Sequence, residues 1–126
     1  YLDPIFPAVP NSDLLFACVR AAKARAYAFH TGIARSHDSF YTDREDEIDA
    51  YWAARSVLGC DMETAALYTI GHLRGVRTMS ILNNVVACES DTLDAIGDYV
   101  DGESAAMRGE EHEILVALDA LAQIMK

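Results

Sequence analysis

The chain has 126 residues and a mass of 13.8 kDa, which is the size of one domain. Apolar residues make up 52% of it, enough for a core and too many for an intrinsically disordered chain. Its 20 acidic and 10 basic residues give a net charge of −10, so electrostatic binding of a nucleic acid is not expected, and no apolar run is long enough to cross a membrane.

The first half of the chain is expected to form two helices with a short strand between them. All 3 prolines lie in residues 1–10, which predict an extended segment. The Asn-Ser-Asp sequence at residues 11–13 predicts a helix start, because apolar residues follow it with a period near 3.6. Residues 27–33 predict a buried strand, and residues 48–57 predict a second helix after a polar loop. The apolar positions of the first helix are Leu14, Leu15, Cys18, Val19 and Ala22.

The second half is expected to begin with a helix that leads into a strand. Asp61 is expected to open this helix and Gly75 to end it, because apolar residues recur at helical spacing between them. Residues 76–82 are apolar and predict a strand. The two asparagines at residues 83–84 are expected to end that strand in a turn.

A mobile loop with a short helix inside is expected over residues 85–101, and a final helix over about residues 102–126. The complete order of helices and strands indicates an α/β layer arrangement. Since sheets commonly have about five or six strands, the few strands here predict that the chain is half of a larger domain. One face of the final helix is expected to carry Ile114, Leu118, Leu121 and Met125.

Several kinds of functional site are excluded because their motifs are missing. The 7 glycines form neither GxGxxG nor GxxxxGK, so Rossmann and P-loop nucleotide sites are not expected. Cys18, Cys60 and Cys88 form no CxxC pair, which excludes a zinc knuckle and predicts free thiols in a reduced cytoplasm. His112 lies between two glutamates on the predicted final helix, where adjacent side chains point apart. No metal and no organic cofactor is therefore predicted.

Candidate ligand-binding residues follow the predicted strands. In open α/β sheets, ligands bind outside the carboxyl ends of the strands. Residues 36–44, 61–63 and 83–88 are the segments expected near such ends. Each also has an ordinary structural interpretation. The carboxylates of residues 61–63 suit the positive end of a helix dipole, and Phe40 with Tyr41 would suit a core.

Several short motifs occur in a fixed order along the chain. Ser-x-Asp-x-Phe-Tyr covers residues 36–41, Asp-Met-Glu-Thr-Ala-Ala-Leu-Tyr covers residues 61–68 about twenty residues later, and Gly-Val-Arg at residues 75–77 precedes an apolar stretch. Phe-Pro-Ala-Val at residues 6–9 and His-x-Gly at residues 30–32 accompany them. Together they resemble the C-terminal half of the nucleoside phosphorylase-I family, and most closely the uridine phosphorylases.

The resemblance implies a fold and a reaction. The expected fold is a three-layer αβα phosphorylase-type fold, of which residues 1–126 form the C-terminal half. The expected reaction exchanges phosphate for the base of a nucleoside, giving the free base and ribose 1-phosphate. Inorganic phosphate is then a co-substrate, and no cofactor is needed. The family usually assembles as dimers, often three of them in a hexameric ring, which implies a homo-oligomer, and we expect a cytoplasmic enzyme of nucleotide salvage.

The resemblance also assigns roles to individual residues. Glu63 is expected to accept hydrogen bonds from the ribose 2′- and 3′-hydroxyls and to favour the transition state, in which the ribose ring gains positive charge. Met62 is expected to pack against the ribose, and Phe40 against the base. Asp61 takes the position of a glutamate of the uridine phosphorylases and is expected to belong to the substrate site. Glu63 and Met62 are the expected catalytic residues.

The base is not settled by the resemblance. Purine members place an aspartate at the position of Val86 to protonate the leaving base, whereas the uridine enzymes are apolar there. The Gln and Arg that hold uracil correspond here to Arg44 and Asp46, so either Arg44 reads the base through a shorter loop or the pyrimidine interpretation is wrong. Asn83 and Asn84 can contact either base, although a turn is the commoner role for at least one of them. Uridine is favoured, and purine nucleosides are the alternative.

The phosphate site of the family lies in its N-terminal half, which has no counterpart in this chain. A partner piece, present as a separate or cleaved chain, is expected to supply the phosphate ligands and the remaining strands. Three other functions stay open. The first is a nucleosidase that uses water, which the apolar Val86 disfavours. The second is a catalytically silent nucleoside-binding relative, and the third is an unrelated acidic interaction domain.

Overall fold

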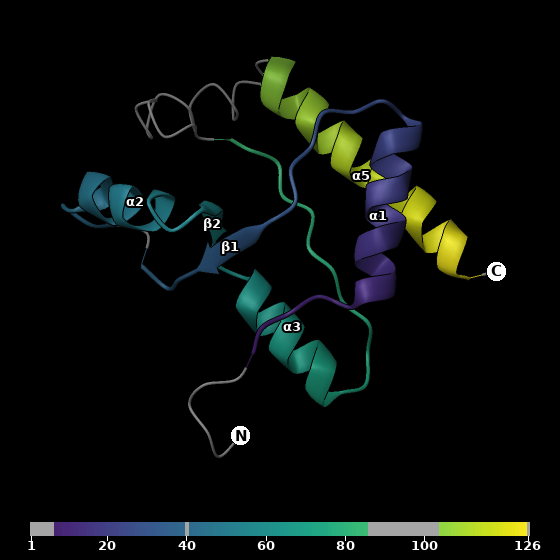
Figure 1. Cartoon of the computed structure of the whole chain (residues 1–126), viewed down its shortest axis with the longest axis horizontal. Helices are drawn as coiled ribbons and strands as arrows, with labels where there is room; N and C mark the ends of the chain where they lie inside the picture. Colours follow the sequence, from purple (N-terminus) through teal and green to yellow (C-terminus); the bar gives the residue numbers. More distant parts are fainter. Residues whose placement is uncertain (1–6, 40, 86–103, 126) are drawn as a thin grey trace. The chain divides into compact units, whose positions relative to one another are not determined.

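The computed structural model describes residues 7–39, 41–85 and 104–125 (Figure 1). The chain divides into two compact units, the first containing Tyr1–Asn11 and Phe29–Met79 and the second containing Ser12–Ala28 and Ser80–Lys126. Its helices and strands are, in chain order, α1 (Ser12–Ala24), β1 (Ile33–Ser36), α2 (Glu45–Ala53), β2 (Val57–Asp61), α3 (Thr64–Leu73) and α5 (Ser104–Ile124).

The first unit is built on two parallel strands. β1 pairs with β2, and their register places Ser36 opposite Asp61 at the carboxyl ends of both strands. Parallel strands need a crossover connection, and α2 lies within this one. β2 then leads into α3 through Met62 and Glu63. The carboxyl ends of the two strands and the start of α3 therefore belong to one small region of the molecule.

The end of α3 follows from the glycine expected to stop it. Gly75 has a φ of 67°, a left-handed conformation that glycine adopts without steric cost. The backbone N–H of Gly75 donates to the carbonyl oxygen of His72 at 3.1 Å, and that of Val76 donates to the carbonyl oxygen of Gly71 at 2.8 Å. These two bonds form a Schellman motif, so the predicted stop at Gly75 is confirmed.

The second unit is a pair of packed helices, α1 and α5. Ala17 and Ala120 are almost completely buried, and such small side chains let the two backbones approach closely. Polar groups flank this core. The Arg25 guanidinium donates to the Asp119 carboxylate at 2.7 Å and thereby lowers the pKa of Asp119. The buried apolar side chains of the pair are Leu14, Ala17, Cys18, Ala21, Ala22, Val116 and Ala120.

The predicted helix boundaries are partly confirmed. The first helix begins at Ser12, as its Asn-Ser-Asp start predicted. The second was expected over residues 48–57 but spans Glu45–Ala53, because residues 57–61 form β2, a strand that the sequence pattern does not predict. The third begins at Thr64 and not at Asp61, since Asp61 still pairs with β1.

The predicted strands are placed less well. A strand was expected over residues 27–33, and the observed strand is Ile33–Ser36. Residues 76–82 were also expected to form a strand, but the structure assigns none to them. A strand needs a ladder of backbone hydrogen bonds to a partner, and the described residues form no such ladder with this segment. The loop predicted over residues 85–101 lies, apart from Val85, outside the described residues.

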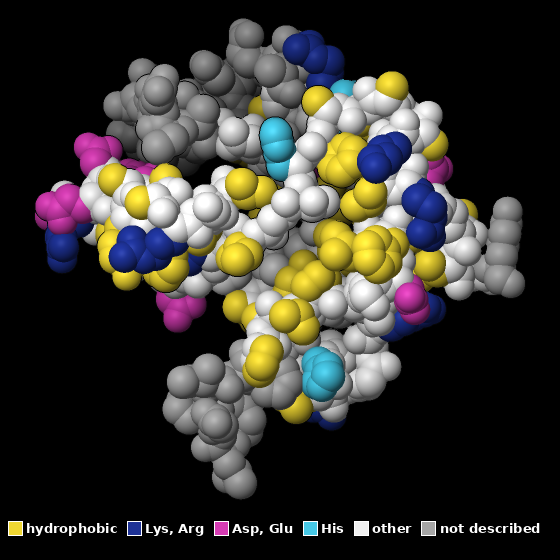
Figure 2. Space-filling model, viewed as in Figure 1, with side chains coloured by type: hydrophobic (Ala, Val, Ile, Leu, Met, Phe, Trp, Pro, Cys, Tyr) yellow, Lys and Arg dark blue, Asp and Glu magenta, His cyan; other side chains and the backbone are white. Residues whose placement is uncertain are grey.

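The four apolar residues expected on one face of the final helix are not the ones that pack on α1. Those four side chains are 46–83% exposed, whereas Val116 and Ala120 are buried. Figure 2 shows hydrophobic side chains on the surface of the chain. In the first unit, Ile33 and Leu58 are likewise exposed. Exposed apolar surface of this extent is typical of faces that pack against further protein.

Candidate functional site

A hydrogen-bond network joins the carboxyl ends of the two strands to the start of α3. The Ser36 hydroxyl donates to Asp61 Oδ1 at 2.6 Å and accepts from the backbone N–H of Ala65 at 2.9 Å. The backbone N–H of His37 donates to the carbonyl oxygen of Asp61 at 3.0 Å. β1, β2 and α3 are thus connected at the edge of the sheet where ligands of α/β proteins usually bind.

Asp61 caps α3 from two residues before the N-cap residue, Glu63, whose own side chain makes no capping bond. Asp61 Oδ2 accepts a hydrogen bond from the backbone N–H of Thr64 at 2.8 Å. Burial on its own would raise the pKa of Asp61, but hydrogen bonds from Ser36, Thr64 and the backbone of Glu63 outweigh it, so the pKa is lowered. The N–H groups of Thr64 and Ala65 are therefore taken by the protein itself and are not offered to a bound phosphate.

Met62 and Glu63 form the short loop between β2 and α3. Both side chains are exposed, and the backbone N–H of Met62 donates to Glu63 Oε2 at 3.1 Å. A carboxylate has about four lone-pair sites, so Glu63 can accept further hydrogen bonds from a ligand. The loop thus presents an acceptor beside a polarisable apolar side chain. This combination suits a sugar, which has hydroxyl groups and an apolar ring face.

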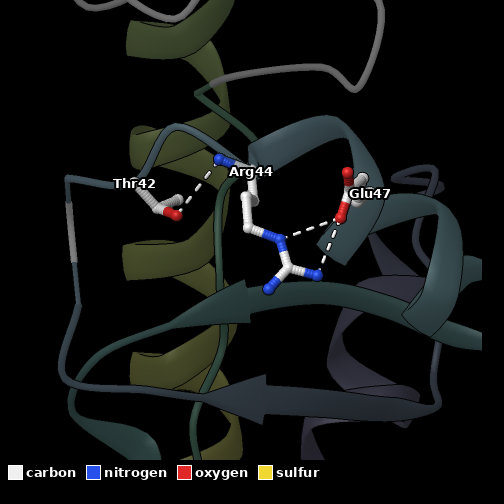
Figure 3. A network of polar contacts seen from close by, with 3 residues as sticks. All are labelled: Thr42, Arg44 and Glu47. Atoms are coloured by element: carbon white, nitrogen blue, oxygen red, sulfur yellow. Dashed lines mark hydrogen bonds and ion pairs between the residues drawn. The ribbon is translucent and has the colours of Figure 1, made fainter.

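Arg44 precedes α2 and is held by a neighbour on that helix. Its Nε and Nη2 atoms both lie 2.8 Å from Glu47 Oε2, and its backbone N–H donates to the Thr42 hydroxyl at 3.2 Å (Figure 3). The side chains of Arg44 and Glu47 are 73% and 67% exposed. Exposed ion pairs of this kind contribute about 1 kcal/mol or less, so a ligand could displace Glu47 at small cost.

The structure brings together only part of the predicted site. Asp61 is the last residue of β2, and Met62 and Glu63 follow it before α3, so these three lie together because they are adjacent in the sequence. Arg44 lies in the same unit, with the contacts to Thr42 and Glu47 given above. Phe40 and Val86 are outside the described residues.

The two asparagines differ in their surroundings. Both belong to the second unit. The Asn83 side chain donates to the carbonyl oxygen of Ala106 at 2.8 Å, in the first turn of α5. Asn84 is exposed. Asn83 thus supports the start of a helix, which leaves Asn84 as the asparagine with a side chain open to solvent.

Ser36 is the residue that sequence reasoning passed over. It is the first residue of the Ser-x-Asp-x-Phe-Tyr motif and lies in a candidate ligand-binding segment, but the family resemblance assigns it no role. The one feature of the sequence that points to a role for Ser36 is its place near the expected end of a strand. The bond from Ser36 to Asp61 spans 25 positions of sequence, so no local pattern could have revealed it.

The Asp61 cap gives a prediction about stability and its pH dependence. Asp61→Ala is expected to lower the free energy of unfolding by about 1–2 kcal/mol at pH 7. Because the folded-state pKa of Asp61 lies below its ordinary value of 3.8, this stabilisation is present above that value and is lost as the pH falls through the lower folded-state pKa. Urea unfolding of both proteins between pH 7 and pH 3 measures the difference. The exposed Asp43→Ala serves as control, and a pH-independent difference for Asp61→Ala would contradict the prediction.

The described residues contain neither a metal-binding cluster nor a membrane-spanning helix. Within residues 7–39, 41–85 and 104–125, no group of three or more His, Cys, Asp and Glu side chains could hold a metal ion. In the same residues, no helix is both long and apolar enough to cross a membrane. Cys18 and Cys60, the described cysteines, are free thiols, and burial raises the pKa of the Cys18 thiol.

Similarity to known proteins extends over nearly the whole chain. Residues 1–109 match the model of the Phosphorylase superfamily. The chain is 39% identical over 77 residues to a DeoD-type purine nucleoside phosphorylase of Roseobacter denitrificans, covering 61% of this chain and 32% of that protein. It is 27% identical over 122 residues to a guanosine phosphorylase of Halorubrum lacusprofundi, covering 94% of this chain and 49% of that protein.

Solved structures give the same result for the fold. The crystal structure of uridine phosphorylase from Vibrio fischeri ES114 matches with a TM-score of 0.83 and 39% sequence identity, over 98% of this chain and 49% of that one. This match confirms the expected phosphorylase-type α/β fold. The chain spans about half the length of this structure, and between about a third and a half of the relatives named above.

Proposed function

The chain belongs to the phosphorylase superfamily, and on that premise we propose that it carries the nucleoside-binding part of a nucleoside phosphorylase. Such an enzyme is a pentosyltransferase that moves the ribosyl group of a nucleoside to inorganic phosphate. The observation that supports this function best is the Asp61-Met62-Glu63 loop, which is held at the carboxyl ends of two parallel strands.

The proposed reaction depends on the alignment of the reactants and on negative charge beside the ribose more than on a strong acid or base. A phosphate oxygen forms a bond to ribose C1′ while the bond from C1′ to the base nitrogen breaks and its electron pair leaves with the base. Positive charge builds on the ribose ring as that bond loosens. Glu63 would accept hydrogen bonds from the 2′- and 3′-hydroxyls, and its negative charge would favour the transition state over the ground state. Met62 would pack on the ribose and hold it in line.

The favoured base is uracil. Support comes from the apolar Val86 at the position where purine members of the family have an acid. Phe40 would pack against the base, Asn84 and Val86 would line the base side, and Arg44 would contact the polar edge of the base. A purine base is the second candidate. It is supported by the Roseobacter denitrificans purine nucleoside phosphorylase, which is also 39% identical, although over 61% of this chain against 98% for the uridine phosphorylase structure.

The phosphate ligands would come from outside these residues. The start of α3, the helix beside Glu63, already has its first N–H groups bonded to Asp61 and Ser36. The remaining half of the fold, on a separate or a cleaved chain, would supply the phosphate ligands. The assembled enzyme would be a homo-oligomer, a dimer or a hexameric trimer of dimers. It would act in the cytoplasm in nucleotide salvage, with no partner among nucleic acids or membranes.

Base release from uridine and from inosine, with and without phosphate, tests this function in the assembled enzyme. Phosphate-dependent release of uracil together with ribose 1-phosphate is the expected result. Phosphate-dependent release of hypoxanthine instead would give the purine assignment. Release that needs no phosphate would identify a nucleosidase, and no release from either nucleoside would favour the silent relative.

Arg44→Ala tests the proposed base contact. Losing a guanidinium that binds the base is expected to raise KM for the preferred nucleoside about three- to tenfold with little change in kcat, since a hydrogen bond to a charged group contributes about 1.5–3 kcal/mol and exposure reduces it. Arg55→Ala is the matched control, because Arg55 lies over the Tyr51 ring at 3.5 Å and has no proposed role. Steady-state kinetics with uridine, thymidine and inosine give the measurement. Unchanged selectivity among them would remove Arg44 from the base site.

A further inference from the structure

We infer that Ser36 is a positioning residue for catalysis, because its hydroxyl fixes the loop that carries Met62 and Glu63. This inference rests on the proposed function, since Glu63 acts on the ribose only if the enzyme is a nucleoside phosphorylase. Ser36 itself would touch neither substrate. Its contribution would come through the placement of the Glu63 carboxylate.

The geometry of the hydroxyl carries the inference. Ser36 Oγ donates its single hydrogen to Asp61 Oδ1 at 2.6 Å, which leaves its lone pairs free to accept the backbone N–H of Ala65 at 2.9 Å. Asp61 immediately precedes Met62, and Ala65 follows Glu63 by two positions. One side chain on β1 therefore binds both ends of the loop.

The other contacts at this point do not replace the hydroxyl. The backbone bond from His37 to Asp61, at 3.0 Å, fixes the end of β2 against β1. The bond from the Thr64 N–H to Asp61 Oδ2, at 2.8 Å, fixes the start of α3 against β2. The Ser36 bond to Ala65 instead connects α3 directly to β1. Without the hydroxyl, α3 would keep its cap, but the loop would lose its connection across the two strands.

The loss of that connection is expected to act on rate more than on folding. The cap of α3 and the pairing of β1 with β2 do not require the hydroxyl, so the fold should persist. A misplacement of about 1 Å in a group that acts in the transition state can lower a rate by about a hundredfold. The Glu63 loop remains tethered by Asp61, so a loss of about tenfold in kcat is expected for Ser36→Ala, with KM for the nucleoside changed by less than about threefold.

The test compares Ser36→Ala with Ser36→Thr and Ser56→Ala in the assembled enzyme. Threonine keeps a hydroxyl and should restore kcat to within about threefold of wild type. Ser56 is exposed and lies before β2, and its alanine variant should match wild type. If Ser36→Ala does not fold, Ser36→Cys takes its place, because a thiol is a similar-sized but weaker donor and should lower kcat in the same direction.

The outcomes separate this inference from the proposed function. A tenfold loss in kcat with KM retained, reversed by threonine, supports the inference. Wild-type phosphorolysis with an unchanged kcat in Ser36→Ala overturns the inference alone. A kcat loss that threonine does not reverse, in a folded protein, also overturns it, since the hydroxyl is then not the cause. Absence of phosphorolysis in the wild-type enzyme overturns the function and the inference together.

Discussion

Glu63→Gln is expected to lower kcat for nucleoside phosphorolysis by about a hundredfold or more, while KM for the nucleoside changes by less than about threefold. The amide has the size of the carboxylate and can still accept hydrogen bonds from the ribose hydroxyls. It can also accept the backbone N–H of Met62, which donates to Glu63 Oε2 at 3.1 Å. The loss is therefore of the negative charge, which matters most when the ribose ring is positive.

Steady-state and single-turnover kinetics of the assembled enzyme measure this effect. Glu111→Gln is a suitable control, because Glu111 is exposed on α5 and has no proposed role in the site. Single-turnover rates show whether the chemical step has slowed or only product release. A rise in KM for the nucleoside with kcat unchanged would assign Glu63 to binding alone and would remove its role in the transition state.

Ala120→Leu is expected to destabilise the second unit by about 1–3 kcal/mol, because it adds three carbon atoms where α1 and α5 pack closely. Ala120 is 1% exposed, and Ala17 on α1 is 0% exposed. A larger side chain would force the helices apart. It would also disturb the hydrogen bond from Arg25 to Asp119, because Asp119 is the residue before Ala120. The midpoint of urea unfolding is the measurement.

Ala24→Leu is the matched control for this prediction. Ala24 is the last residue of α1 and is exposed, so the same added volume meets solvent there. The free energy of unfolding of the Ala24→Leu variant should stay within about 0.5 kcal/mol of wild type. If the two variants were equally stable, the close packing of α1 on α5 would be wrong.

The two helices of the second unit show what periodicity can and cannot predict. A period near 3.6 located α1 correctly. Three of its five predicted apolar positions, Leu14, Cys18 and Ala22, are buried. The other two, Leu15 and Val19, are only half-buried. The same method found the stripe that contains Leu118 on α5, yet that stripe is exposed, and Ala120 faces α1 instead. α5 carries apolar side chains both on the buried face that contains Val116 and Ala120 and on the exposed face that contains Leu118. Sequence alone does not reveal which face meets a given neighbour, because that depends on the shape of the partner.

The strands were harder to predict for a related physical reason. Residues 57–61 contain a glycine and an aspartate, so their pattern is weak, and they become β2 through backbone bonds to β1. Residues 76–82 have a stronger apolar pattern but no strand partner in the described residues. Strand formation depends on distant residues, and half the length of the matched uridine phosphorylase structure lies beyond this chain.

The motif Asp61-Met62-Glu63 was found from sequence because its residues are adjacent. Its connection to Ser36 could not be found in the same way, because Ser36 on β1 and Asp61 on β2 meet only when the two strands pair in register. The roles of Phe40 and Val86 stay predictions, since both residues lie outside the described part of the chain.

A crystal structure of the assembled enzyme with a nucleoside bound tests most directly whether Glu63 holds the ribose at the carboxyl ends of β1 and β2. We expect a Glu63 carboxylate oxygen within about 3 Å of the 2′- or 3′-hydroxyl oxygen, and Met62 packed against the sugar. The bond from Ser36 to Asp61 should be present in the same complex. A nucleoside bound away from this loop, or a ribose whose hydroxyls are held by other side chains, would contradict the assignment.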